Sequence, residues 1–215
     1  PIASRAPRDR HYTRHQRSLA IGPAVFAMLC LVSLCFPGYA QGAGDYSYLV
    51  AYAGPYSDSS LAEDILTLQD IKFEDAYLAT VGYGRVFRRP SERRQWELEG
   101  QLGKWFGDQT NLELNAAVNH RWTAFPWDRL IDTSLALGNG LSLASSTPEL
   151  EEKLEEDGTA RLLYYLNLEA TFSPPVSDRW AIIIRIHHRS GVFGLFGGVK
   201  GGSNTLSLGV KFNLD

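Results

Sequence analysis

From about residue 45 onward, the chain consists of long runs in which apolar and polar side chains alternate. Alternation with a period of two places one kind of side chain on each face of a β-strand. Eight such runs are present, at 45–54, 73–88, 94–107, 112–124, 129–143, 161–173, 178–190 and 203–214. Their length exceeds the five or six residues usual in soluble sheets and matches tilted strands that cross a bilayer.

The two faces of these runs differ in chemistry. One face carries leucines, isoleucines and aromatic residues, whereas the other carries small residues and charges of both signs. The charged residues of this second face are Glu97, Glu99, Glu113, Asp132, Glu169, Arg121, Arg161, Arg185 and Lys211. A soluble barrel would bury the apolar face, but a membrane barrel turns it to lipid and fills its lumen with polar side chains. Charges of both signs, together with aromatic residues at the run ends, favour the membrane barrel.

The connections between the runs alternate in length. With the start of the first run on the periplasmic side, the outer loops are 55–72, 108–111, 144–160 and 191–202, and the inner turns are 89–93, 125–128 and 174–177. Three of the four outer loops are long and every inner turn is short, as in outer-membrane barrels. The sequence therefore predicts an all-β fold, an eight-stranded antiparallel transmembrane β-barrel. The acidic segment Glu149 to Gly158 is expected to form a short helix or a loop.

The segment that precedes the barrel resembles a targeting sequence. Five arginines lie within the first 17 residues, an apolar run follows from Leu19 to Phe36, and small residues precede Gln41. We expect residues 1–40 to be a basic leader and signal peptide, cleaved on export, and residues 41–215 to be the barrel in the bacterial outer membrane. A membrane anchor is the alternative reading of this segment. Both cysteines, Cys30 and Cys35, lie in it, which leaves no disulfide or thiolate site for the barrel.

Charge and size narrow the classes of function. Without the five arginines and one aspartate of residues 1–40, the chain keeps 16 basic and 23 acidic residues, a net charge of −7. An acidic chain of this kind argues against nucleic acid as a partner. An eight-stranded barrel is filled by its own side chains, which argues against transport. Any chemistry is therefore expected at the rim and on the lipid-facing wall.

A candidate catalytic group lies where the last two runs meet. His188 and Ser190 share one face near the outer end of the seventh run, and Asn204 is expected as a cross-strand neighbour on the eighth. A serine that attacks an ester needs a base within hydrogen-bond reach, and that base needs a third group to fix its tautomer. Ser190, His188 and Asn204 could fill these three roles. Polar residues at a membrane rim also occur without any catalytic role.

Other polar residues near this site are expected to be structural. By their positions in the period-two alternation, His187 is expected to face the lumen, and His120 to face lipid near the inner end of the fourth run. Arg185 and Arg189 are expected to pair with lumen carboxylates, and Arg189 could also meet a lipid phosphate at the rim.

The chain resembles the PagL-type lipid A 3-O-deacylases, a family of outer-membrane esterases. The resemblance rests on His188-Arg189-Ser190, a glycine-rich loop, and Gly202-Ser203-Asn204-Thr205-Leu206-Ser207-Leu208, with Leu137-Gly138-Asn139-Gly140-Leu141-Ser142 as a further familial stretch. It implies removal of the ester-linked 3-hydroxyacyl chain at position 3 of lipid A, with Ser190 as nucleophile, His188 as base, and neither metal nor cofactor.

The chain departs from this family at the site itself. The family has a Glu at the start of the last strand to orient the histidine, where this chain has Asn204, and an Asn after the serine, where this chain has Gly191. The backbone N–H of Gly191 is therefore our candidate donor to the oxyanion. The expected partner is lipid A of lipopolysaccharide in the outer leaflet, and the sequence leaves open whether the barrel acts alone or as a homodimer. Two rival functions are a non-enzymatic small barrel with a structural or adhesive role, and a soluble secreted barrel that holds an apolar ligand.

Overall fold

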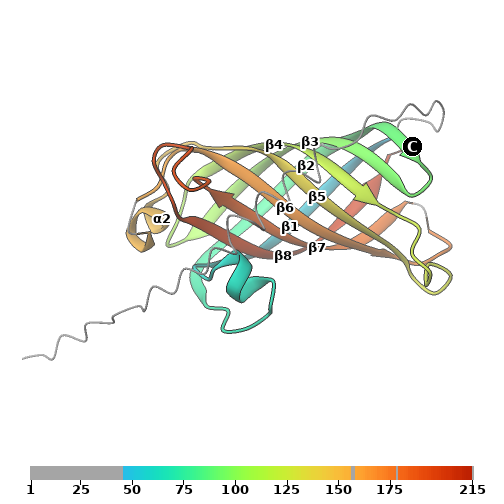
Figure 1. Ribbon diagram of the computed structural model, residues 1–215, viewed down its shortest axis with the longest axis horizontal. Helices are drawn as coiled ribbons and strands as arrows, with labels where there is room; N and C mark the ends of the chain where they lie inside the picture. The colour runs from blue at the N-terminus through green and yellow to red at the C-terminus, as the bar shows by residue number, and fades with distance from the viewer. Residues whose placement is uncertain (1–45, 156–157, 178, 215) are drawn as a thin grey trace, which may run out of the picture.

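Eight antiparallel strands follow one another around a closed barrel, and β8 closes the ring on β1 (Figure 1). The structure is a computed structural model that describes residues 46–155, 158–177 and 179–214; the expected signal peptide lies outside these residues. The strands are β1 Ser47–Ser57, β2 Phe73–Ser91, β3 Arg94–Gly107, β4 Leu112–Trp122, β5 Asp132–Ala144, β6 Leu162–Ser173, β7 Trp180–Ser190 and β8 Gly202–Asn213. The predicted eight-stranded antiparallel barrel is confirmed.

The strand boundaries follow the alternating runs to within three residues. β1 ends later than expected, at Ser57, β5 begins later, at Asp132, and β2 continues into the first inner turn. A turn was expected at 89–93, but β2 continues through Pro90 to Ser91, which pairs with Arg94. The pairing register between β2 and β3 shifts after Val86 and again after Arg88. These irregularities accommodate the proline, which cannot donate to the ladder, and they shorten the turn to two residues.

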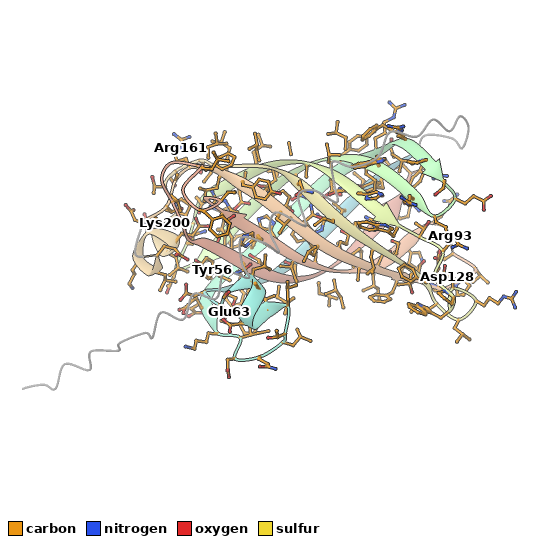
Figure 2. The ribbon with its side chains drawn as sticks, viewed as in Figure 1. Tyr56, Glu63, Arg93, Asp128, Arg161 and Lys200 are labelled. Carbon is orange, nitrogen blue, oxygen red and sulfur yellow. The ribbon has the colours of Figure 1, made fainter. Side chains whose placement is uncertain are left out.

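Two short helices lie at the end of the barrel that is expected to face outward, called the outer end below; the opposite end is called the periplasmic end. The α2 helix, Glu149–Leu154, forms in the acidic segment where a short helix or a loop was expected. The η1 π-helix, Leu61–Ile65, was not predicted; it belongs to the segment between β1 and β2, which lies beside the barrel wall (Figure 1). Figure 2 places Arg161 and Lys200 at this end of the molecule and Arg93 and Asp128 at the other. Among the described residues, no helix is both long enough and apolar enough to cross a membrane.

The outer wall of the barrel is apolar. Large aliphatic and aromatic side chains that are roughly half exposed cover it on every strand, among them Leu49, Val81, Leu98, Leu102, Leu114, Leu141, Leu162, Ile182, Ile184, Leu208 and Val210. Water would penalise this much contiguous apolar surface, whereas lipid accepts it. The wall therefore has the chemistry of a transmembrane barrel and not of a soluble one.

The lumen is held together by buried ion pairs between strands, both neighbouring and distant ones. Arg121 donates to Glu97 and to Glu169, at 2.6 Å in each case. Arg185 donates to Glu99 at 2.7 Å and pairs with Glu169 as well. Because each of these charges has a partner, the lumen can hold them away from water. The expected pairing of lumen charges is confirmed for these residues.

Two residues expected in this network lie outside it. Arg161 is exposed, and its Nε donates to the carbonyl of Ala144 at 3.0 Å. Asp132 is exposed at the periplasmic start of β5. Both lie at strand ends, where the period-two pattern no longer decides which side of the wall a side chain takes.

The two ends of the lumen differ. At the periplasmic end it opens into a cavity of about 370 Å³ that is lined by Arg89, Arg121 and Lys211 among others. An apolar cluster is buried within the barrel and includes Tyr56, Trp105 and Leu150 of α2. Where α2 packs on it, the lumen therefore contains apolar contacts as well as the predicted polar ones.

Candidate active site

The pairing of β7 with β8 brings the predicted site residues together. His188 lies opposite Asn204, and Ser190 lies opposite Gly202. Directly opposed residues of an antiparallel pair have Cβ atoms about 4.5–5.5 Å apart. The expected cross-strand contact between His188 and Asn204 is present: His188 Nδ1 and Asn204 Oδ1 are 2.8 Å apart.

A second hydrogen bond fixes the carboxamide of Asn204. Its Nδ2 donates to the backbone carbonyl of Ser59 at 2.7 Å. Ser59 belongs to the segment between β1 and β2, and its hydroxyl accepts from the N–H of Lys72 at 2.8 Å. Ser59 therefore ties the two ends of this segment together and presents its carbonyl to Asn204.

These two contacts determine the tautomer of His188. Because Asn204 Nδ2 is committed to a carbonyl, Asn204 Oδ1 faces the histidine and can only accept. His188 Nδ1 must then carry the proton, and in the neutral ring Nε2 is left with the lone pair. A ring held in this state can take a proton from a serine.

Ser190 lies on the same face as His188, one step closer to the outer end of β7. Within the described part of the chain, its hydroxyl makes no hydrogen bond. Its neighbour Gly202 leaves it room, because a Cβ at position 202 would come within 2.8 Å of Ser190 Cβ. Contacts between a nucleophile and its base are often long until substrate binds.

The site is more enclosed than the strand pattern suggested. His188, Ser190 and Asn204 point away from the lumen, yet they are only 9%, 8% and 1% exposed. Ser59 contacts Asn204 from one side, and from the other the loop after β7 brings Phe196 to 6.3 Å from the ring of Tyr164, which lies opposite Ser190. Sequence reasoning missed Ser59, because nothing local links two residues 145 positions apart.

Gly191 takes part in the loop between β7 and β8. Its N–H donates to the carbonyl of Gly201 at 3.2 Å, and a Cβ at this position would lie 1.9 Å from the carbonyl oxygen of Val199. In this conformation the N–H expected to face an oxyanion is engaged in the loop. The next residues, Val192 and Phe193, have φ values of 50° and 54°, a region that is costly for bulky side chains.

His187 and His120, which were expected to be structural residues, both have partners within the protein. His187 faces the lumen, with Nε2 2.7 Å from Glu113 and Nδ1 2.9 Å from the hydroxyl of Tyr52. His120 stacks on Trp96 at the periplasmic end of the wall, with the ring centroids 4.5 Å apart.

The expectation that Arg189 meets a lipid phosphate is wrong. Arg189 is fully buried, and its guanidinium donates to Glu151 of α2 at 2.7 Å. It therefore pairs with a carboxylate, but one supplied by the helix that caps the lumen. The period-two pattern placed Arg189 on the lumen face, but it could not show that α2 covers Arg189 there.

Several solved structures of outer-membrane barrels are similar to this chain. The crystal structure of the outer membrane enzyme PagL matches with a TM-score of 0.51 at 15% identity, covering 79% of this chain and 99% of that one. Neisserial surface protein A matches at 0.48 and 14%, over 79% and 99% of the two chains. The β-barrel domain of Pseudomonas aeruginosa OprF matches at 0.45 and 11%, over 81% and 100%.

No family model matches the chain, and no curated protein does. At 15% identity the likeness to PagL shows a shared outer-membrane barrel fold and nothing about activity. Any function must therefore be argued from the site.

Proposed function

We propose that this protein is an outer-membrane serine esterase that removes the ester-linked 3-hydroxyacyl chain at position 3 of lipid A. The observation that carries the proposal is the chain of contacts from Ser59 through Asn204 to His188, which prepares Nε2 of the histidine as a base. This group is built on the outward face of the wall, near the outer end, with Ser190 beside it.

The carboxamide of Asn204 suits this site better than a carboxylate would. The carbonyl oxygen of Ser59 lies 2.7 Å from Asn204 Nδ2, so a carboxylate in the same place would set one acceptor against another. Cysteine proteases of the papain type also use Asn as the third group beside the histidine. The carboxamide of Asn204 therefore fits this site directly, and Asn204 is not explained only as the remnant of a lost catalytic carboxylate.

The reaction balances with these residues alone. Ser190 Oγ attacks the ester carbonyl carbon while His188 Nε2 takes the hydroxyl proton. The carbon–oxygen bond to the sugar then breaks, and His188 returns the proton to the leaving sugar oxygen. Water, deprotonated by the same nitrogen, attacks the carbonyl carbon of the acyl-serine. The bond to Ser190 Oγ breaks, His188 returns the proton to that oxygen, and the fatty acid is released.

The developing oxyanion needs at least one donor. We propose the N–H of Gly191, which follows the nucleophile in the chain. In the free protein this N–H bonds to Gly201, so binding of substrate would have to exchange that bond for one to the oxyanion. The neighbouring residues with positive φ mark the part of the loop that would move.

The test is mass spectrometry of lipid A from cells that produce the native chain or its Ser190→Ala variant. Loss of one 3-hydroxyacyl chain with the native protein, and intact lipid A with the variant, is the expected result. Ser47→Ala serves as the control, because this serine also lies on the outer face but at the periplasmic end. Unchanged lipid A in all three strains, with folded barrels in the outer membrane, would favour the structural or adhesive function.

A further inference from the structure

A cavity of about 370 Å³ lies at the periplasmic end of the lumen, at the other end of the barrel from the candidate active site. Its volume is within the usual range of small-molecule sites. Three basic side chains from three different strands line it: Arg89 of β2, Arg121 of β4 and Lys211 of β8. Among the described residues of its lining, the only carboxylate is that of Asp132, which is exposed to solvent. The cavity therefore presents an excess of positive charge.

Arg89 is the basic residue of this cavity that the ion pairs of the lumen do not neutralise. In the middle of the lumen three carboxylates balance three cations: Glu97, Glu99 and Glu169 against Arg121, Arg185 and Lys211. In the described part of the chain, Arg89 forms no ion pair, and its Nε is buried without a hydrogen-bond partner. A buried N–H without an acceptor is costly, which gives this group a reason to take its acceptor from a ligand.

The guanidinium of Arg89 is held in place by an aromatic ring. It lies over the ring of Tyr46, with 4.9 Å between Cζ and the ring centroid. Gln95 Nε2 donates to the hydroxyl of Tyr46 at 3.0 Å and thereby fixes the ring. The cation–π contact positions the side chain but leaves Nε without an acceptor. Arg89 is thus oriented before any ligand arrives.

Lys211 has capacity for a further acceptor. Its Nζ lies 3.4 and 3.5 Å from the two carboxylate oxygens of Glu97, which is long for a hydrogen bond between two charged groups. Within the described residues, Glu97 is its only hydrogen-bond partner. An ammonium group has three donors, so Lys211 can serve an anion in the cavity as well.

We propose that this cavity binds a phosphate group, with Arg89 and Lys211 as its two cationic partners. A guanidinium donates two parallel N–H bonds to phosphate oxygens, and an ammonium adds a third. The hydroxyls of Ser173 and Ser177, which also line the cavity, can donate to the remaining oxygens. A phosphate has more acceptor oxygens than a carboxylate and therefore matches this number of donors better. The site lies apart from Ser190 and does not depend on the proposed function.

Two kinds of molecule carry a phosphate group within reach of this cavity: soluble phosphates of the periplasm and phospholipids of the inner leaflet. Trp180 lines the cavity and is also 46% exposed on the outer wall, so the cavity reaches the rim where headgroups lie. The recognised chemistry is the phosphate group in either case.

The first experiment is isothermal titration calorimetry of inorganic phosphate into the protein in octyl glucoside, a detergent without phosphate. The native chain should bind one phosphate per barrel. Arg89→Gln should weaken binding at least about tenfold, the effect of losing one charged hydrogen-bonding partner, and Arg89→Lys should weaken it less. Because Arg89 lies outside the ion pairs of the lumen, Arg89→Gln is expected to fold. The control is Arg93→Gln, which removes an exposed arginine from the turn at the same end and should keep the native Kd (Figure 2).

A second experiment identifies the source of the phosphate. The protein is placed in nanodiscs of phosphatidylcholine with phosphatidylglycerol, and native mass spectrometry counts the phosphatidylglycerol molecules that it retains. Retention of one such lipid by the native chain but not by Arg89→Gln, without binding of free phosphate, identifies a headgroup as the ligand. Binding of free phosphate that depends on Arg89 identifies a soluble ligand. Absence of both, or equal binding by the native chain and Arg89→Gln, overturns the site.

Discussion

At the level of single residues, the carboxamide of Asn204 has two partners that require its two different ends. Its oxygen faces His188 and its nitrogen faces the carbonyl of Ser59. The spacing of His188 and Ser190 was evident from the sequence, because two residues on a strand share a face. The contact between Asn204 and the backbone carbonyl of Ser59 was not evident, because a backbone carbonyl leaves no trace in the pattern of residue types.

We expect Asn204→Ala to lower kcat for ester hydrolysis by on the order of a hundredfold, the contribution of a well-placed general base, with KM little changed. The variant keeps Ser190 but lets the His188 ring take either tautomer. Steady-state kinetics measure the loss, and ¹⁵N NMR of labelled histidine should show the proton distributed over both ring nitrogens. Leu206→Ala, the next outward position on β8, is the control for truncation. Native kcat in Asn204→Ala would rule out the orienting role.

At the level of elements, α2 closes the outer end of the lumen through one carboxylate. Glu151 accepts from Arg189 at 2.7 and 2.9 Å, from the hydroxyl of Ser203 at 2.6 Å and from that of Thr159 at 2.7 Å. Arg189 and Ser203 are opposite each other and alternate along their strands with the candidate catalytic residues. The helix therefore joins β7 to β8 from the lumen side, directly behind the site.

Removing this carboxylate should destabilise the barrel. We expect Glu151→Ala to lower the free energy of unfolding by about 3 kcal/mol, because it leaves the buried guanidinium of Arg189 without its main partner. Urea unfolding in lipid vesicles measures the change. Glu152→Ala, on the exposed side of the same helix, should have almost no effect. Adding Arg189→Leu to Glu151→Ala should restore part of the loss, and failure to do so would mean that the cost has another origin.

The boundaries of the strands and helices show which of these elements the local sequence pattern can predict. Every predicted run became a strand, since alternation over ten or more residues is a strong signal. The η1 helix and the turn after Pro90 were missed. Both depend on contacts with other parts of the chain, η1 on the wall beside it and the turn on the irregular pairing of β2 with β3.

At the level of the whole molecule, the barrel has its polar face inside and its apolar face outside, the reverse of a soluble barrel. Ion pairs fill its lumen and aliphatic side chains cover its wall. Alternation alone could not decide this, since both arrangements have the same period. The burial of the charged side chains, among them Glu97, Glu99 and Arg185, together with the exposure of the aliphatic ones, shows that the charged face is the one enclosed.

A charge on the wall tests this arrangement. Leu208 is 64% exposed in the middle of β8, and we expect Leu208→Arg to destabilise the barrel in a bilayer by roughly 2–4 kcal/mol. Folding into vesicles of phosphatidylcholine measures the cost. The matched control is Leu130→Arg, which places the same charge on a residue that is 82% exposed in a periplasmic turn and should cost little. Equal stability of the two variants would contradict a lipid-facing wall.

The sequence by itself determined the strands, which side chains share a face away from the strand ends, and the placement of His188 and Ser190 on one face. These follow from a period of two, which is a local property of the backbone. The strand order and the pairing of His188 with Asn204 also followed, because short connections make neighbours in the chain neighbours in an antiparallel sheet.

Only the tertiary structure decided what surrounds those residues. It brought the carbonyl of Ser59 to Asn204, Glu151 to Arg189, Tyr164 to Asn139, and the N–H of Gly191 into its own loop. The contacts of Ser59 and Glu151 join segments between strands to strand residues 145 and 38 positions away in the chain, where no periodicity operates. Their partners are chosen by loop closure, burial and the need of each enclosed polar group for a hydrogen bond.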